Sequence, residues 1–288
     1  MPPRFTKFHG FGNDYIVVES EELAGRSDPG EFSRLICDRH YGAGADGIAI
    51  IDHDHGSEAD FHVRIFNPDG SEAGLSGNGT RCAAAYVYYK DLWNGSDLRL
   101  GTRSGVKRYL LIERVGSSKY IFDSELGQPK FDSKSVPFIS EPALERIVDF
   151  PLAVGNETLP ITALQMGNPN CCIFVNEFDD LDWRRLGRLI EDHQQFPDRT
   201  NVVFVRVNDR ETIELRIWER GVGETTASGT CSCAAAVAAI INGQTERRLT
   251  ARMPGGQARI HWRDDGEVVI NAPAELVYEG DWLGPKKT

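Results

Sequence analysis

The chain has 288 residues, 40% of them hydrophobic, and its formal net charge at pH 7 is −11. This length exceeds one usual hydrophobic core, so two domains are expected, and the acidic balance leaves no basic face for a phosphate backbone, which argues against nucleic acid as a partner. No apolar run is long enough to cross a bilayer and residues 1–19 lack the apolar core of a signal peptide, so we expect a cytoplasmic protein with no membrane partner.

Short strand-like runs dominate the chain and alternate with a few helical segments. In chain order, strands are predicted at residues 15–18, 48–51, 61–66, 109–113, 119–122, 171–175, 202–207, 213–218, 258–262 and 267–271. Helices are predicted at residues 32–38, 79–90, 183–192 and 231–241. The second and fourth helices are apolar on every face, which is typical of a buried helix. Each half is therefore expected to wrap a sheet around one central helix, in an α+β fold.

One segment of the chain occurs twice. Arg216 follows Arg64, and Ser228 follows Ser76, by the same 152 residues, and an alanine-rich run comes after each serine. The repeated unit reads as a strand, a glycine-rich turn and a helix. A period of about 150 residues indicates two duplicated domains rather than a solenoid.

The domain boundaries follow from this repeat. The first domain is predicted at residues 1–126 and the second at residues 127–272. A segment rich in proline, serine, aspartate and lysine at residues 128–142 is expected to be the linker. The last predicted strand, Glu275–Tyr278, has no counterpart in the repeat, so residues 273–288 are expected to return to the first domain.

Each copy of the repeat places a Ser-Gly pair at the start of a buried helix. Unpaired backbone N–H groups and the helix dipole at such a start favour a carboxylate. Two equivalent starts could present matched groups to opposite faces of one small molecule, as inversion of a stereocentre requires. We therefore predict that the hydroxyls of Ser76 and Ser228 face one shared cleft. Simple N-capping by each serine is the alternative.

Polar residues at turns and strand ends are candidates for fixing the rest of a ligand. Glu219 could meet a substrate ammonium or activate a serine, and with Arg220 it could instead form a surface ion pair. The asparagines could equally serve turn geometry alone. The candidates among them are Asn13, Asn67, Asn78, Asn168 and Asn201.

The six cysteines have spacings that match no zinc pattern, so no metal is expected. Cys37, Cys82, Cys171 and Cys172 are interpreted as small buried hydrophobic residues. Cys231 lies at the predicted first turn of a helix, where the pKa of its thiol is expected to be lowered.

Seven segments of the chain resemble diaminopimelate epimerases, in the order that the family has them. The resemblance covers the chain nearly end to end. It is carried by residues 8–14 (FHGFGND), 39–47 (from Arg39-His40 to Gly44-Ala45-Asp46-Gly47), 64–72 (RIFNPDGSE), 166–169 (MGNP), 200–202 (TNV), 219–225 (ERGVGET) and 253–256 (MPGG).

The resemblance implies a fold of two pseudo-symmetric α/β domains, each a β-barrel around a central helix. It also implies epimerisation of LL- to meso-diaminopimelate, a step of lysine and peptidoglycan synthesis, without pyridoxal phosphate, metal or another cofactor. The amino-acid substrate would be the main partner, and a homodimer is also expected. The substrate contacts that the resemblance implies are Asn13, Asn67, Gly77, Asn78, Asn168, Asn201, Glu219, Arg220, Gly229 and Thr230.

The chain departs from the family at three positions. Ser76 and Ser228 stand where the family has its two catalytic cysteines, and Asn170 stands where it usually has a histidine. A cysteine is partly thiolate at neutral pH, whereas a serine needs a neighbouring base. Three interpretations remain open: an engineered Cys-to-Ser variant, a natural paralogue with isomerase or dehydratase chemistry, and an amino-acid-binding protein that has lost the chemistry.

Overall fold

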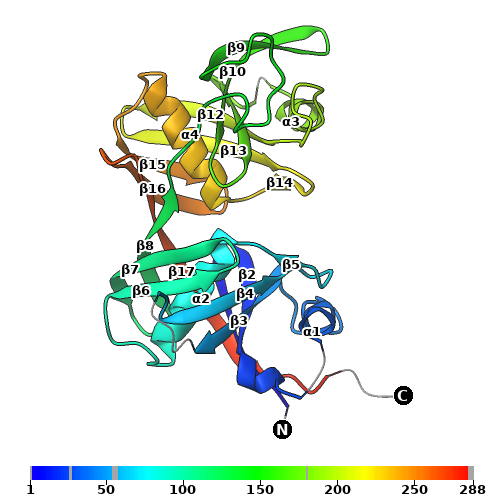
Figure 1. Ribbon diagram of the computed structural model, residues 1–288, viewed down its shortest axis with the longest axis vertical. Helices are drawn as coiled ribbons and strands as arrows, with labels where there is room; N and C mark the ends of the chain where they lie inside the picture. The colour runs from blue at the N-terminus through cyan, green and yellow to red at the C-terminus, as the bar shows by residue number, and fades with distance from the viewer. Residues whose placement is uncertain (1, 26–27, 54–57, 180, 285–288) are drawn as a thin grey trace. The chain divides into compact units, whose positions relative to one another are not determined.

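The computed structural model describes residues 2–25, 28–53, 58–179 and 181–284 (Figure 1). The chain separates into two compact units: unit 1 comprises Met1–Ser124 with Ala272–Thr288, and unit 2 comprises Glu125–Asn271. The chain passes from unit 1 to unit 2 within strand β8 (Lys119–Gly127) and returns within strand β17 (Val268–Asp281).

Unit 1 is a closed barrel of eight strands. Hydrogen-bonded neighbours follow the order β1–β2–β3–β4–β6–β7–β8–β17 and back to β1, and the pairs β2–β3 and β4–β6 are parallel. A short strand, β5, pairs with β4 beside this ring. The elements confined to unit 1 are β1 (Arg4–Gly10), β2 (Asn13–Glu19), η1 (Ser20–Leu23), α1 (Pro29–Ile36), β3 (Gly47–His53), β4 (Phe61–Phe66), β5 (Glu72–Ala73), α2 (Gly77–Tyr89), β6 (Asp97–Thr102) and β7 (Gly105–Val115).

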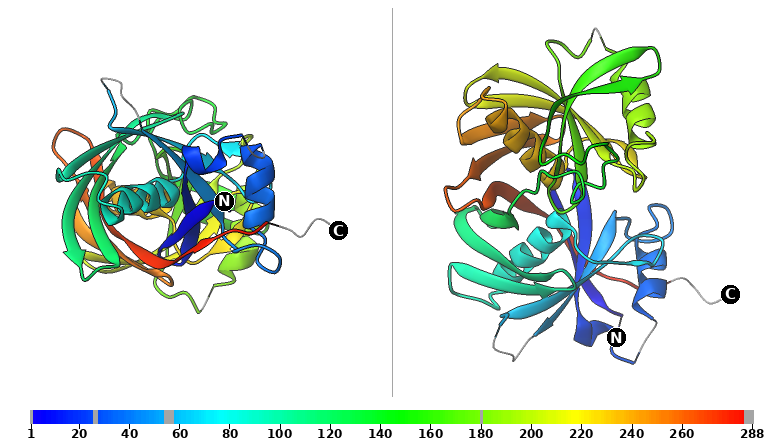
Figure 2. Two further views of the ribbon diagram at one scale, coloured as in Figure 1. Left: turned by 90° about the horizontal axis from the view of Figure 1, so that it is seen from below. Right: turned by 45° about the horizontal axis from the view of Figure 1, so that its top comes forward.

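Helix α2 fills the barrel of unit 1. Its residues 78–88 are buried, and it contacts β1, β2, β3, β4 and β6 (Figure 2). Its alanines allow strands to approach closely, and Tyr86 and Tyr88 add two larger side chains to the same core. The predicted central helix is confirmed, because a helix that is apolar on every face must bury every face.

Unit 2 repeats this arrangement around helix α4. Its strands pair in the order β9–β10–β11–β12–β13–β15–β16–β17, and β11–β12 and β13–β15 are parallel. The helix contacts the strands from β10 to β13 as well as β15 and β16. The elements are β9 (Ile147–Val154), β10 (Glu157–Gln165), β11 (Pro169–Phe174), α3 (Trp183–Glu191), β12 (Asn201–Asp209), β13 (Thr212–Glu219), β14 (Gly223–Thr225), α4 (Gly229–Ile241), β15 (Arg248–Met253) and β16 (Gly256–Trp262).

The duplication is visible residue by residue. Helices α2 and α4 each have 13 residues, and both ends are separated by 152 positions. Tyr15 of β2 lies opposite Gly47 of β3, and Asn170 of β11 lies opposite Asn201 of β12, in the same kind of parallel pair. Because the registers of the next strand pairs also match, Tyr15 and Asn170 occupy equivalent positions in the two units.

Two predictions about the chain's course are corrected. The expected linker, residues 128–142, packs onto unit 2, since Val136 and Phe138 belong to its hydrophobic core. The last strand is longer than predicted, and residues 275–281 pair with β1.

The sequence pattern also misses β1, β6, β9, β10 and β15, which mix polar and apolar residues. In β1 the interruption is Lys7, which is buried because Asp14 neutralises it at 2.7 Å.

No helix within the described ranges has the length and apolar character needed to span a membrane.

Candidate active site

In unit 2, strand β13 ends at Glu219 and helix α4 begins after Ser228. Ser228 has extended backbone angles and its side chain does not cap the helix. Its hydroxyl instead donates a hydrogen bond to Oε2 of Glu219 at 3.1 Å, and lies 3.5 Å from the hydroxyl of Thr230. The structure thus joins a serine to a carboxylate at a helix start whose first N–H groups receive no cap from Ser228.

The carboxyl group of Glu219 is partly buried, with the hydroxyls of Thr225 and Ser228 beside it. Burial raises its pKa above the ordinary value of 4.5, and these two hydroxyls partly oppose the shift. A carboxylate with a raised pKa is a stronger base than an exposed one. Glu219 is therefore suited to receive a proton from Ser228.

A second buried carboxylate fixes the turn that follows Glu219. Glu191, at the end of α3, accepts hydrogen bonds from the indole N–H of Trp218 at 2.7 Å and from the backbone N–H of Gly221 at 2.6 Å. It also pairs with Arg199. Gly221 has φ of 77°, in the left-handed region that favours glycine. These contacts hold the residues on both sides of Glu219 in place.

Asparagines form a hydrogen-bonded chain beside this turn. Asn201 accepts a bond from the backbone N–H of Arg220 at 2.9 Å and donates to Asn170 at 3.2 Å. Asn170 in turn donates to the backbone and side-chain oxygens of Asn168. The turn before Asn168 approaches helix α4, since a Cβ on Gly167 would lie 3.7 Å from the methyl group of Thr230.

In unit 1, Ser76 occupies the position equivalent to Ser228 but is bonded differently. Its hydroxyl oxygen accepts the backbone N–H of Gly79 at 3.0 Å, so Ser76 caps helix α2. The hydroxyl of Tyr15 lies beside it. Burial raises the pKa of this phenol to about 12, and the Ser76 hydroxyl partly opposes the shift. Asn67 stands at the position of Glu219, and its amide donates to Ser71 at 2.9 Å.

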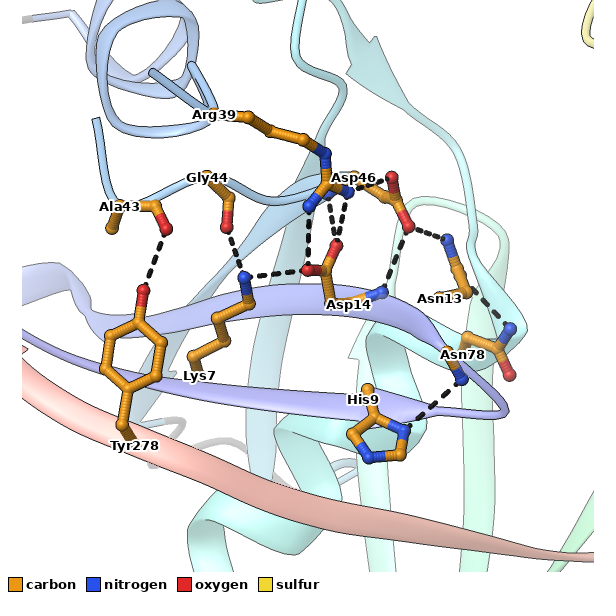
Figure 3. Close-up of polar contacts among 11 residues, drawn as sticks. Lys7, His9, Asn13, Asp14, Arg39, Ala43, Gly44, Asp46, Asn78 and Tyr278 are labelled. Atoms are coloured by element: carbon orange, nitrogen blue, oxygen red, sulfur yellow. Dashed lines mark hydrogen bonds and ion pairs between the residues drawn. The ribbon is translucent and has the colours of Figure 1, made fainter. Parts of the chain in front are cut away.

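An ion-pair cluster supports Asn13 in unit 1. Figure 3 shows Lys7 and Arg39 converging on Asp14, with Lys7 at 2.7 Å and Arg39 at 2.9 Å. Burial opposes ionisation of Asp14, but the hydrogen bonds and charges of Arg39 and Lys7 hold its pKa below the ordinary value. Arg39 also pairs with Asp46 at 2.7 Å.

Asp46 connects this ion-pair cluster to two candidate binding residues, Asn13 and Asn78. Its Oδ2 accepts the amide of Asn13 at 2.8 Å, and Oδ1 of Asn13 accepts the amide of Asn78 at 3.1 Å (Figure 3). The buried Arg81 completes the chain by donating to Oδ1 of Asn78. Asn13 and Asn78 are therefore held from both sides.

The prediction for Cys231 is wrong. Burial, followed by the charge of Glu219, raises the pKa of its thiol well above the ordinary value, so helix position does not make it reactive. All six cysteines are buried and none is in a disulfide. The four that were interpreted as small hydrophobic residues are confirmed as such.

Most of the predicted site residues lie close together within their own unit. In unit 2, Ser228 contacts Glu219 and Thr230, Asn201 contacts Arg220, and Asn168 connects to Asn201 through Asn170. In unit 1, Asn13 contacts Asn78. Asn67 instead donates from its side-chain amide to Ser71, in the turn between β4 and β5, and its backbone oxygen accepts the hydroxyl of Ser33. Gly77 and Gly229 are the first residues of α2 and α4.

Sequence reasoning missed three supporting residues. Tyr15 begins the predicted strand at residues 15–18 and Asp46 belongs to the motif at residues 39–47, but only the structure shows the first beside Ser76 and the second bound to Asn13. Glu191 lies 28 positions before Glu219 and gave no sequence signal. In the part of the chain that the structure describes, no three His, Cys, Asp or Glu side chains gather as they would around a metal ion.

Comparison with known proteins adds independent information. The model of the family described as diaminopimelate epimerase matches residues 5–128 and 162–277. The diaminopimelate epimerase of Pelotomaculum thermopropionicum is 40% identical over 280 residues, covering 96% of this chain and 98% of that protein. The enzyme of the same name from Desulforudis audaxviator is 38% identical over 282 residues, covering 97% and 99%.

Solved structures share the fold at lower identity. A Bacillus anthracis phenazine biosynthesis protein of the PhzF family aligns with a TM-score of 0.66 and 17% identity, covering 98% of this chain and 99% of that one. A hydroxyproline epimerase from Agrobacterium vitis, solved with bound trans-4-hydroxy-L-proline, aligns with a TM-score of 0.64 and 14% identity, covering 99% and 95%. Both likenesses concern the fold alone.

Proposed function

The chain belongs to the diaminopimelate epimerase family, and from this we propose that it is a cofactor-independent epimerase that interconverts LL- and meso-diaminopimelate. The reaction is a two-base proton transfer at the α-carbon, with one group removing the proton from one face and another group supplying a proton to the opposite face. Of the observations made on this chain, the hydrogen bond from Ser228 to Glu219 supports the proposal most directly.

Ser228 and Glu219 form the base on one face. In this step the α-proton moves to Oγ of Ser228 while the hydroxyl proton of Ser228 moves to Oε2 of Glu219. The raised pKa of Glu219 makes it a better proton acceptor than an exposed carboxylate. The pair therefore supplies the neighbouring base that a serine needs at neutral pH.

Ser76 supplies the proton on the other face. Because its oxygen accepts the N–H of Gly79, its own hydroxyl proton is free to move to the substrate carbon, and the oxygen left behind takes a proton from the neighbouring phenol of Tyr15. In the reverse direction the roles of Ser76 and Ser228 exchange. The proposal requires both serines to act on a single substrate molecule.

The helix starts bind and activate the substrate. Backbone N–H groups at Gly77 and Asn78 and at Gly229 and Thr230 hold the α-carboxylate, and they stabilise the enolate-like charge that forms when the α-proton leaves. The asparagines Asn13, Asn67, Asn78, Asn168 and Asn201, together with Glu219 and Arg220, hold the ammonium groups and the distal end of the substrate.

A second candidate is a protein that binds diaminopimelate or a related amino acid without inverting it, or that runs a different isomerisation. The serines at positions 76 and 228 favour it, because a serine hydroxyl has no thiolate-like fraction at neutral pH. Glu219 offers a base to Ser228 only, and Ser76 has a tyrosine as its partner.

Proton exchange distinguishes the two candidates. The purified protein is incubated with LL- or meso-diaminopimelate in D₂O, and α-deuterium is followed by NMR together with the stereoisomer ratio. An epimerase incorporates deuterium and inverts the centre, whereas a pure binding protein does neither. Saturable binding measured by calorimetry without deuterium incorporation would refute the enzymatic proposal. We further propose a cytoplasmic location and a homodimer, which cell fractionation and sedimentation velocity test.

A further inference from the structure

Asn170 is a fully buried polar residue in the middle of a sheet. Its side chain has 0% exposure, and its strand β11 is paired on both sides, with β10 and with β12. The residues that follow it in the strand are Cys171, Cys172 and Ile173. A buried amide costs free energy unless its groups are hydrogen-bonded, so packing alone would be served better here by an apolar residue.

The amide of Asn170 makes three hydrogen bonds, all of them to candidate substrate-binding residues. Its Nδ2 donates to the backbone oxygen of Asn168 at 2.7 Å and to Oδ1 of Asn168 at 3.2 Å. Its Oδ1 accepts Nδ2 of Asn201 at 3.2 Å. Asn201 then accepts the backbone N–H of Arg220 at 2.9 Å. Three segments that are distant in sequence are thus tied to one side chain.

We infer that Asn170 is a positioning residue, which fixes Asn168, Asn201 and the Glu219–Arg220 turn in the geometry that binds the substrate. It does not touch the substrate, because it is fully buried. The inference rests on the proposed function for the identity of the substrate. The equivalent position in unit 1 is occupied by Tyr15, whose hydroxyl lies beside Ser76.

An amide suits this role because it both donates and accepts and does not titrate. It donates to two oxygens of Asn168 and accepts from Asn201 at the same time. A carboxylate of the same shape could accept from Asn201 but would repel both oxygens of Asn168. When protonated, it could donate to one of them. The geometry of the three segments should therefore become pH-dependent when Asn170 is replaced by aspartate.

The experiment compares Asn170→Leu and Asn170→Asp with the control Thr162→Val. Thr162 is also buried, on the neighbouring strand β10, and its hydroxyl accepts hydrogen bonds from the amide of Asn242 at 3.0 Å and from the backbone N–H of Asp149 at 3.5 Å, neither of which is a candidate binding residue. Asn170→Leu should raise KM for diaminopimelate about tenfold or more, the effect of losing one or more buried hydrogen bonds, while kcat changes less. Thr162→Val should lower Tm and leave KM unchanged.

The pH profile gives a second readout that a packing role would not move. The ratio of kcat/KM for Asn170→Asp to that of the unmodified protein should rise as pH falls, because the introduced carboxyl becomes a donor. If Asn170→Leu does not fold, this ratio decides the question. An unchanged KM in Asn170→Leu, or a ratio that does not vary with pH, would overturn the inference.

If the protein is not an epimerase, the same variants give a result that can be told apart from failure of the positioning role. A protein that incorporates no deuterium at all contradicts the epimerase proposal but leaves binding measurable. The dissociation constant for meso-diaminopimelate from calorimetry then replaces KM, and Asn170→Leu should still weaken binding about tenfold. Equal affinity in both proteins would overturn the positioning role.

Discussion

The hydroxyl of Ser228 donates to Oε2 of Glu219 at 3.1 Å, whereas Ser76, the equivalent residue 152 positions earlier, caps its own helix through the N–H of Gly79. The starts of helices α2 and α4, although equivalent in the duplicated backbone, thus differ in their chemistry. One has a carboxylate beside the serine, and the other has the phenol of Tyr15.

Glu219→Gln should slow α-proton exchange by about 10²- to 10⁴-fold, the usual contribution of a general base. The glutamine keeps the size of the side chain but cannot accept a full proton from Ser228. Exchange and inversion are measured by NMR in D₂O. The control is Glu224→Gln, which removes an exposed carboxylate of the same turn that pairs with Arg184. Equal losses in the two variants would contradict the role of Glu219.

The pH dependence should follow the raised pKa of Glu219. The rate needs its carboxylate, so kcat should fall on the acidic side at a pH above the ordinary glutamate value of 4.5. Stability should move in the opposite direction. Since the folded protein holds this proton more tightly than the unfolded chain, the free energy of unfolding decreases as pH rises from the unfolded pKa through the folded one. Urea titrations should therefore find Glu219→Gln more stable than the unmodified protein at neutral pH, with the difference vanishing in acid.

Restoring thiols should speed the chemistry more than it improves binding. Ser76→Cys together with Ser228→Cys should raise α-proton exchange by orders of magnitude, because the ordinary pKa of a thiol, about 8.5, brings it far closer to ionisation at neutral pH than a serine hydroxyl. Either single change should leave inversion poor, since one face still lacks an efficient group, and the effects should be non-additive. A double variant that binds diaminopimelate and exchanges no deuterium would favour the binding protein.

Ligand binding should depend on the α-carboxylate. Charge-assisted hydrogen bonds from the helix starts contribute about 1.5–3 kcal/mol, so calorimetry should show affinity falling at least tenfold when the carboxylate is replaced by an amide or removed. The matched comparison changes the ligand and not the protein. Equal affinity for the decarboxylated amine would mean that the helix starts do not hold this group.

Gly79→Ala should destabilise the protein, although alanine normally favours a helix by about 1 kcal/mol. A Cβ at position 79 would lie 2.8 Å from Cε1 of Tyr15 and 3.0 Å from Cδ1 of Ile65, both in the core of unit 1. Gly77→Ala, in the same turn, is the control, because nothing lies within 4 Å of its Cβ. Thermal unfolding should show a lower Tm for the first variant and an unchanged or higher Tm for the second.

Periodicity in the sequence predicted the two central helices and most of the strands around them. Apolar residues on every face of residues 79–90 and 231–241 predicted two enclosed helices, and the constant offset predicted their equivalence. Two buried segments were not recognised from the sequence pattern, because each contains polar residues. Lys7 breaks the apolar pattern of β1 although Asp14 neutralises it, and the polar residues around Val136 conceal its place in the core.

The candidate residues were predictable and their partners were not. The motifs pointed to Ser228, Glu219 and the asparagines, since each stands at a turn or a strand end. The bond between Ser228 and Glu219, the support of Asn13 by Asp46 and the central place of Asn170 depend on which side chains the strand registers bring together. The pKa of Cys231 depends on the depth of burial, which helix position alone does not reveal.

The return of β17 to unit 1 sets the order in which a ribosome can complete the two units. Strand β1 acquires its second neighbour only with residues 275–281, and the Nε–H of Arg81 gains the backbone oxygen of Pro273 as an acceptor only when that residue is in place. Unit 2 is continuous, so its strands β9 to β16 can pair as soon as they are synthesised. Unit 1 is translated first but closes last, and a chain that stops after residue 271 exposes the edge of β1 to neighbouring molecules.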